Sequence, residues 1–149
     1  MRKLCLGALL LCALLLCAAC QGTGNQEEQQ AASYQEAMAK AQTIQVQDAA
    51  GQTVDTLSQQ EEIATFLEEL DLGHWTYWEA APQAQPLGTF VFLEASTIKL
   101  GQTEPDGWVE TCRLTLYPED TITLEILGLT LTFTLEEAAW GTLATRLPS

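Results

Sequence analysis

The sequence is poor in histidine, in positive charge, and in cysteine beyond its first twenty residues. It has one histidine, His74, and 6 lysine and arginine residues against 20 aspartate and glutamate residues, so its formal net charge is −14. Four of the five cysteines fall within residues 1–20, which leaves Cys112 as the only later one. The shortage of cationic side chains argues against nucleic-acid binding and against a polybasic contact with anionic lipid.

Catalytic and metal-binding patterns are scarce as well. Cys112 and His74 are the only Cys/His pair in this later part, but Cys112 shares its alternation with Leu114 and Leu116, which predicts a buried and inert thiol. One histidine does not supply a zinc cluster, and no Asp-rich calcium loop is present. The Gly22-Thr23-Gly24 segment follows no strand, so it does not match a phosphate loop. We therefore expect no catalytic residues, no metal site and no cofactor.

The first 19 residues have the layout of an export signal. Met1-Arg2-Lys3 gives a positively charged start, and residues 4–19 carry no charge and consist almost wholly of Leu, Ala and Cys. A transmembrane helix needs roughly 20 apolar residues to cross about 30 Å of hydrocarbon, and this run is shorter. We therefore predict a signal peptide over residues 1–19 that is removed on export.

The end of this segment, Leu16-Cys17-Ala18-Ala19-Cys20, resembles the bacterial lipobox, in which a small residue precedes the cysteine that is acylated. It departs from that pattern at Cys17, where leucine is usual. The other three cysteines of the segment are each preceded by leucine, which the small-residue requirement disfavours. The resemblance implies lipidation of Cys20 with diacylglycerol and stable anchoring by acyl chains. An ordinary secretory signal cleaved after Ala19 is the alternative.

Residues 20–42 are predicted to be the lipidated cysteine and a polar tether, rich in Gln, Ala, Glu, Gly and Ser. A weak helix is expected over residues 27–42, but Tyr34 and Met38 bury too little apolar surface to hold it on a core. After signal removal four cations remain against 20 carboxylates, 4 − 20 = −16. Attachment to a membrane must therefore come from the lipid, and Cys112 has no disulfide partner.

Residues 43–149 are predicted to form a single α+β domain. Alternating apolar and polar residues predict strands at 44–48, 53–56, 74–78, 89–93, 97–101, 112–117, 122–126 and 129–133. The short connections between the last three strands require an antiparallel meander.

Two capping boxes mark the starts of two helices. The first, Ser58 to Glu61, precedes a helix whose apolar face includes Ile63 and Phe66 and which ends at Gly73. The second, Thr134 to Glu137, opens a helix in which Leu135, Ala139, Trp140 and Leu143 face inward. The predicted architecture is two-layered, a mainly antiparallel sheet with two helices packed on one face.

Aromatic side chains are the strongest candidates for a binding site. Trp75, Tyr77 and Trp78 lie in one predicted strand, with Trp108 as a neighbour. Alternation places Trp75 and Tyr77 on one face and Trp78 on the other. Exposed Trp and Tyr often anchor ligands. Two interpretations stay open, a binding patch and a set of rings at the edge of the core.

The pattern as a whole resembles small lipoproteins of Gram-positive bacteria. We expect a membrane-anchored lipoprotein that faces outside the cytoplasm and whose non-catalytic domain binds a protein or a cell-envelope component. The alternatives are a small-ligand sensor or carrier, with a pocket between helix and sheet, and an envelope enzyme of unrecognised type. If the cell has two membranes, the residue after Cys20 becomes informative. It is Gln21 rather than aspartate, which is typical of lipoproteins released to the outer membrane.

Overall fold

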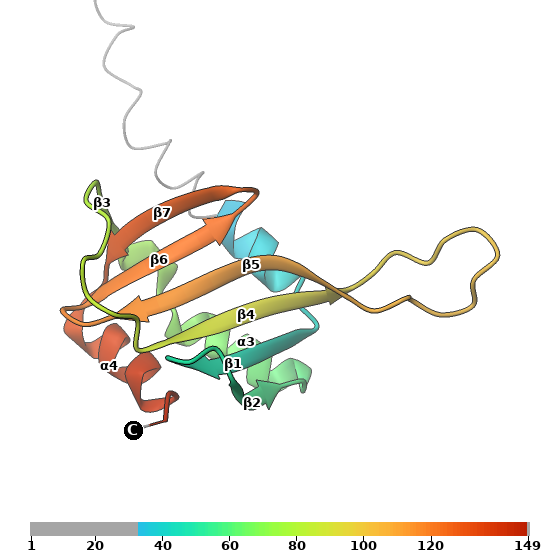
Figure 1. The fold of residues 1–149 in the computed structure, drawn as a ribbon, viewed down its shortest axis with the longest axis horizontal. Coiled ribbons are helices and arrows are strands. Elements are labelled where there is room, and N and C mark those ends of the chain that lie inside the picture. Colours follow the sequence, from blue (N-terminus) through green and yellow to red (C-terminus); the bar gives the residue numbers. More distant parts are fainter. Residues whose placement is uncertain (1–32, 149) are drawn as a thin grey trace, which may run out of the picture. The chain divides into compact units, whose positions relative to one another are not determined.

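A seven-stranded antiparallel sheet organises the part of the chain that the structure, a computed structural model, describes, residues 33–148 (Figure 1). The predicted signal peptide and Cys20 lie outside the described residues. The strands are β1 Thr43–Asp48, β2 Thr53–Leu57, β3 Thr76–Trp78, β4 Gly88–Ala95, β5 Trp108–Tyr117, β6 Thr121–Ile126 and β7 Leu129–Thr134. Their order is β2-β1-β4-β5-β6-β7-β3. The antiparallel meander predicted for β5, β6 and β7 is confirmed.

Helices cover one face of this sheet, behind the strands in the view of Figure 1. They are α3, Gln60–Glu69, α4, Glu137–Thr145, and a helical segment over residues 33–39. The predicted α+β class is confirmed, with three helices in place of the expected two. Arg146, which follows α4, joins it to α3, because its Nε lies 2.7 Å from Oε2 of Glu69. Its guanidinium also lies 5.3 Å from the centre of the Phe66 ring.

The third helix lies within the predicted tether. Met38 has no exposed surface, Ala41 is buried, and the Tyr34 ring stands edge-on to Phe133 with 6.2 Å between ring centres. The expectation that Tyr34 and Met38 bury too little to hold this segment is therefore wrong. The flexible side chain of Met38 inserts fully into the core, and Tyr34, Ala37 and Ala41 add contacts on the same side of the segment.

The core lies between the helices and the face of the sheet toward which alternate strand residues point. Phe90 and Phe92 of β4 contact Phe66 of α3, with ring centres 4.9 and 6.0 Å apart. Ile63, Phe66 and Leu70 are buried, which confirms the predicted apolar face of α3. The burial predicted around the last helix is also confirmed, since Leu135 and Leu143 are buried and the other two pack against the core. The predicted capping box is wrong, because Thr134 ends β7 and Glu136 precedes α4, so Leu135 lies before the helix.

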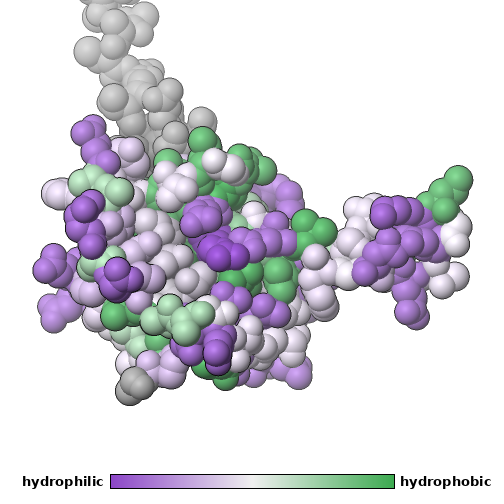
Figure 2. Space-filling view, viewed as in Figure 1, coloured by the Kyte–Doolittle hydropathy of each residue, from purple (hydrophilic) through white to green (hydrophobic). Residues whose placement is uncertain are grey.

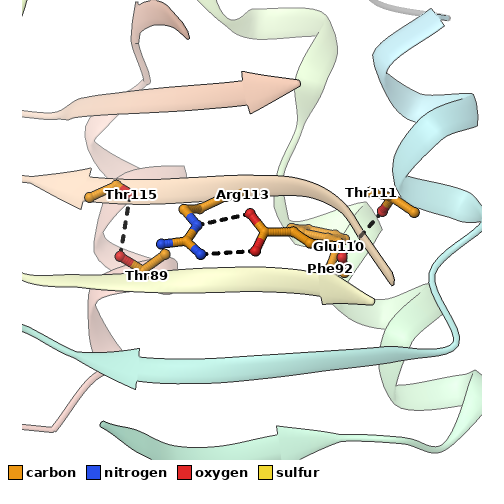
Figure 3. Close-up of polar contacts among 6 residues, drawn as sticks. All are labelled: Thr89, Phe92, Glu110, Thr111, Arg113 and Thr115. Atoms are coloured by element: carbon orange, nitrogen blue, oxygen red, sulfur yellow. Dashed lines mark hydrogen bonds and ion pairs between the residues drawn. The ribbon is translucent and has the colours of Figure 1, made fainter. Parts of the chain in front are cut away.

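The opposite face carries threonine. Four threonines lie in register across β4 to β7, with Gln47 at one end of the row and Trp78 at the other; they are Thr89, Thr115, Thr123 and Thr132. Figure 3 shows the first pair, whose hydroxyl oxygens are 3.3 Å apart. β-Branched side chains such as threonine pack well on a pleated surface.

Residues 79–87 return the chain from β3 at the sheet edge to β4.

The predicted boundaries of the first helix are shifted. Gln59, not Ser58, precedes it, and its backbone N–H donates to the Glu62 carboxylate at 3.3 Å. The helix ends at Glu69, before Gly73, because Asp71 takes the left-handed conformation with φ 47°. A 3₁₀ turn, η1, Leu72–His74, follows, so β3 begins two residues later than predicted.

The strand predicted at 97–101 is absent from the described structure. Residues 96–107 instead form an arm that projects from the end of β4 and β5 (Figure 1). The backbone N–H of Ser96 donates to the carbonyl of Gly107 at 2.8 Å, and Lys99 Nζ lies 3.0 Å from Oδ2 of Asp106. Ile98 and Leu100 alternate as in a strand, but with no neighbouring strand to cover them both remain exposed.

Candidate functional site

The structure divides the aromatic candidates between two environments. The indole Nε1 of Trp75 donates to the carbonyl of Leu70 at 2.6 Å, and its ring centre lies 5.3 Å from that of Phe133. Tyr77 contacts the same Phe133 at 6.1 Å but is largely exposed. Trp78 is 54% exposed at the end of the threonine row. Trp75 therefore packs at the core edge, whereas Trp78 remains available on the other face.

Trp108 lies far from this group. It begins β5, pairs with Ala95 at the base of the arm, and is 57% exposed. Thr115, which shares the row of Trp78, is seven residues further along β5, and seven residues of strand span about 23 Å. The structure does not bring Trp108 together with Trp78.

Trp108 belongs instead to an exposed apolar surface at the arm end of the sheet. Ten large apolar side chains are exposed among the described residues, and six of them lie on the arm, at its base and on the β6–β7 turn. These six, which we call the arm–hairpin surface, are Ile98, Leu100, Trp108, Val109, Leu127 and Leu129. Figure 2 shows apolar colour at the tip of the arm and on the body beside its base.

A shallow open depression of about 380 Å³ connects the base of β5 with the β6–β7 turn. Its walls include Glu110 and Thr111 from β5, Glu125 and Ile126 from β6, the turn residues Leu127 and Gly128, and the start of β7. Two carboxylates and the exposed Leu127 thus line one depression. This juxtaposition could not be predicted from the residue pattern, because it depends on how far β5 extends beyond its predicted start.

The two carboxylates differ in their partners. Glu110 accepts hydrogen bonds from Nε and a terminal nitrogen of Arg113 at 3.0 and 2.9 Å (Figure 3). That pairing raises the pKa of Arg113 above its ordinary value, with smaller contributions from the charges of Glu110 and Glu125. Glu125 stands in register with Arg113 but forms no ion pair with any described residue. It is exposed and free to accept a cation.

Carboxylates outnumber the available cations throughout the described domain. Residues 33–148 contain four lysine and arginine side chains, and each already pairs with a carboxylate. The pairs are Lys40 with Glu36, Lys99 with Asp106, Arg113 with Glu110, and Arg146 with Glu69. The unpaired charge on this domain is therefore negative.

Cys112 and His74 do not form a catalytic pair in this structure. Cys112 is buried, as predicted, and burial raises the pKa of its thiol to about 12. His74 is exposed on η1, with Nδ1 2.8 Å from Oδ1 of Asp71, and no hydrogen bond joins it to Cys112. No group of three or more metal-ligating side chains occurs within residues 33–148.

The pKa of His74 should lie above its ordinary value of about 6.5, because the hydrogen bond and the charge of Asp71, and then the charge of Glu136, favour the imidazolium. Any stabilisation from this pair is present at low pH and is lost as pH rises through the raised pKa. NMR titration of the single histidine should show a raised midpoint in the native chain. Asp71→Asn should lower that midpoint more than Glu136→Gln does; an unchanged midpoint in Asp71→Asn would contradict the assignment.

Comparison with known proteins assigns the chain to no family. No family model, no curated protein and no solved structure matches it. Within residues 33–148 no helix is both long and apolar enough to span a bilayer.

Proposed function

We propose that this chain is a lipid-anchored protein on the outer side of a bacterial membrane, and that its domain binds a partner protein through the arm–hairpin surface. The gathering of six of ten exposed large apolar side chains at one end of the sheet carries the proposal. Large apolar side chains that gather exposed at one end of a domain commonly mark an interaction site. An aromatic ring with aliphatic neighbours is also a typical composition for the centre of a protein interface.

The shape of the depression favours a protein partner over a small-molecule ligand. It is open and lies at the turn end of the sheet. Small-ligand sites usually enclose most of their ligand. The expected carrier pocket would lie between helix and sheet, whereas this depression is formed by β5, β6 and the β6–β7 turn.

The lipid anchor is supported by the lipobox-like residues before Cys20 and by the acidic composition. An acidic domain has no electrostatic attraction to anionic lipid, so a covalent lipid is the available means of attachment. Cells that express the chain should incorporate labelled fatty acid into it, and Cys20→Ala should abolish the label. Labelling that survives this substitution would refute the assignment of Cys20.

Partner binding can be tested in the native envelope by site-specific photo-crosslinking. A photoreactive amino acid at position 127, on the β6–β7 turn, should give one or a few discrete adducts with the full-length lipoprotein. The same group at Val54, an exposed residue on edge strand β2, is the matched control. Equal adduct patterns at the two positions, or none at 127, would contradict binding through the arm–hairpin surface.

A further inference from the structure

We infer that the arm–hairpin surface binds a basic protein segment, with an aliphatic side chain of the partner packed on Leu127 and a lysine or arginine paired with Glu125. This inference rests on the proposed function and names the chemistry of the partner. Three features of the described residues support it: the conformation of Leu127, the free carboxylate of Glu125, and the charge balance of the domain.

Leu127 is disfavoured in both its conformation and its exposure. It has φ 52° and is 93% exposed at the β6–β7 turn, followed by Gly128 with φ 79°. Positive φ at both turn residues suits asparagine at the first position, whereas for leucine it is unfavourable because Cβ comes too close to the following carbonyl oxygen. The other described non-glycine residues with positive φ are acidic, namely Asp71, Glu119 and Asp120. A leucine held in this state points to a contact that the isolated chain does not show.

Glu125 places a free charge beside this leucine. Both side chains line the same depression, and Glu125 lies in register with Thr130 on the neighbouring strand. Arg113 already makes its two hydrogen bonds to Glu110. A partner cation that reaches Glu125 therefore meets no competing ion pair among the described residues. A segment with a basic residue next to an aliphatic one matches both groups at once.

The negative charge of the domain indicates which kind of partner can bind to its exposed apolar surface. All four cations within residues 33–148 are paired, so the remaining field is negative. Like charges repel a second copy of the chain and an anionic bilayer, whereas a basic partner is attracted and oriented. The acidic field and the apolar surface together favour a basic protein segment.

The binding test uses the full-length mature lipoprotein in nanodiscs of neutral phosphatidylcholine, with empty nanodiscs subtracted. Three fluorescent heptapeptides are titrated and followed by anisotropy: alternating Lys-Leu, alternating Glu-Leu and alternating Lys-Ser. The Lys-Leu peptide should bind at least about tenfold more tightly than either of the others, since each lacks one of the two contacts. Equal binding of Lys-Leu and Lys-Ser would show charge attraction alone and overturn the inference, as would equal binding of Glu-Leu.

Leu127→Asn separates binding from folding. The substitution should weaken Lys-Leu binding about tenfold, yet raise the melting temperature by about 2–5 °C because asparagine tolerates positive φ. Glu119→Asp is the matched control: it relieves a residue at φ 60° on the β5–β6 turn and keeps the charge. It should leave binding unchanged. Undiminished binding in Leu127→Asn would overturn the inference, whereas failure to fold would show as lost thermal transition.

Glu125→Gln tests the ionic contact. Binding of the Lys-Leu peptide should weaken about three- to tenfold at low salt, and the difference from the native protein should shrink at about 0.5 M salt through screening. Glu68→Gln removes one exposed carboxylate from α3 and should have little effect. Equal losses in the two variants would reduce the effect to net charge and overturn the role of Glu125.

Two further results distinguish this inference from the proposed function. A crosslinked partner at position 127 whose bound segment is acidic would leave the proposed function standing and overturn the inference. Self-association of the lipoprotein in detergent that Leu127→Asn abolishes, seen by sedimentation, would assign the surface to a second copy and overturn it as well.

Discussion

Replacing Trp75 with alanine should lower the free energy of unfolding by about 3 kcal/mol, because the ring packs against Phe133 at the core edge and the site cannot collapse fully. The loss also leaves the carbonyl of Leu70 without the indole N–H that now donates to it. Trp78→Ala is the matched comparison, since Trp78 is half-exposed on the other face of the sheet. Its cost should stay below about 1 kcal/mol.

Urea unfolding followed by circular dichroism measures both variants. The contrast decides between the two interpretations of the aromatic group residue by residue. A large loss in Trp78→Ala would place that ring in the structural core as well and would remove it as a surface anchor. A small loss in Trp75→Ala would contradict the packing described for it.

Gly88→Ala is expected to destabilise the domain by about 2–3 kcal/mol through overpacking. A Cβ at this first residue of β4 would lie 2.5 Å from Cδ2 of Leu147 and 2.6 Å from the backbone carbonyl oxygen of Gln47. Leu147 can rotate away, but the carbonyl belongs to β1, which pairs with β4 along its length. Relief therefore requires movement of the sheet backbone.

Gly141→Ala is the opposite case and serves as its control. A Cβ at Gly141 meets no atom within 4 Å, and the residue lies inside α4. Alanine there should raise the free energy of unfolding by about 0.5–1 kcal/mol, since it restricts the unfolded chain and favours the helix. Thermal unfolding of the two variants should shift in opposite directions; a shift of both in the same direction would contradict the close approach at Gly88.

Alternation predicted β5, β6 and β7 well because their large apolar side chains point to the core face, whereas the opposite face carries mostly polar residues, among them buried threonines. Cys112, Leu114 and Leu116 all point into the core, as their spacing predicts. The same pattern misled at Ile98 and Leu100, since alternation says nothing about whether a neighbouring strand exists to complete the sheet. The helix over residues 33–39 was underestimated because two of the four inward residues at helical spacing are alanines, which mark an apolar face only weakly. The four residues are Tyr34, Ala37, Met38 and Ala41.

The candidate site was harder to predict than the fold. The sequence identifies Trp108 as a large aromatic residue, but its distance from Trp78 depends on strand length and register. The role of Leu127 is still harder to predict, because Leu-Gly between two strands is the pattern of an ordinary turn. Its significance comes from a backbone angle and an exposed fraction, and neither quantity is encoded in local residue pattern.

The accessibility of the buried Cys112 thiol reports local opening of the sheet. Cys112 lies in β5, paired with Phe92 on one side and Ile126 on the other, and its pKa of about 12 leaves almost no thiolate at neutral pH. If lipid blocks Cys20, this is the one thiol of the mature chain that remains to be alkylated. The alkylation rate of Cys112 then measures how often the centre of the sheet separates. A partner bound to the β6–β7 turn should lower this rate.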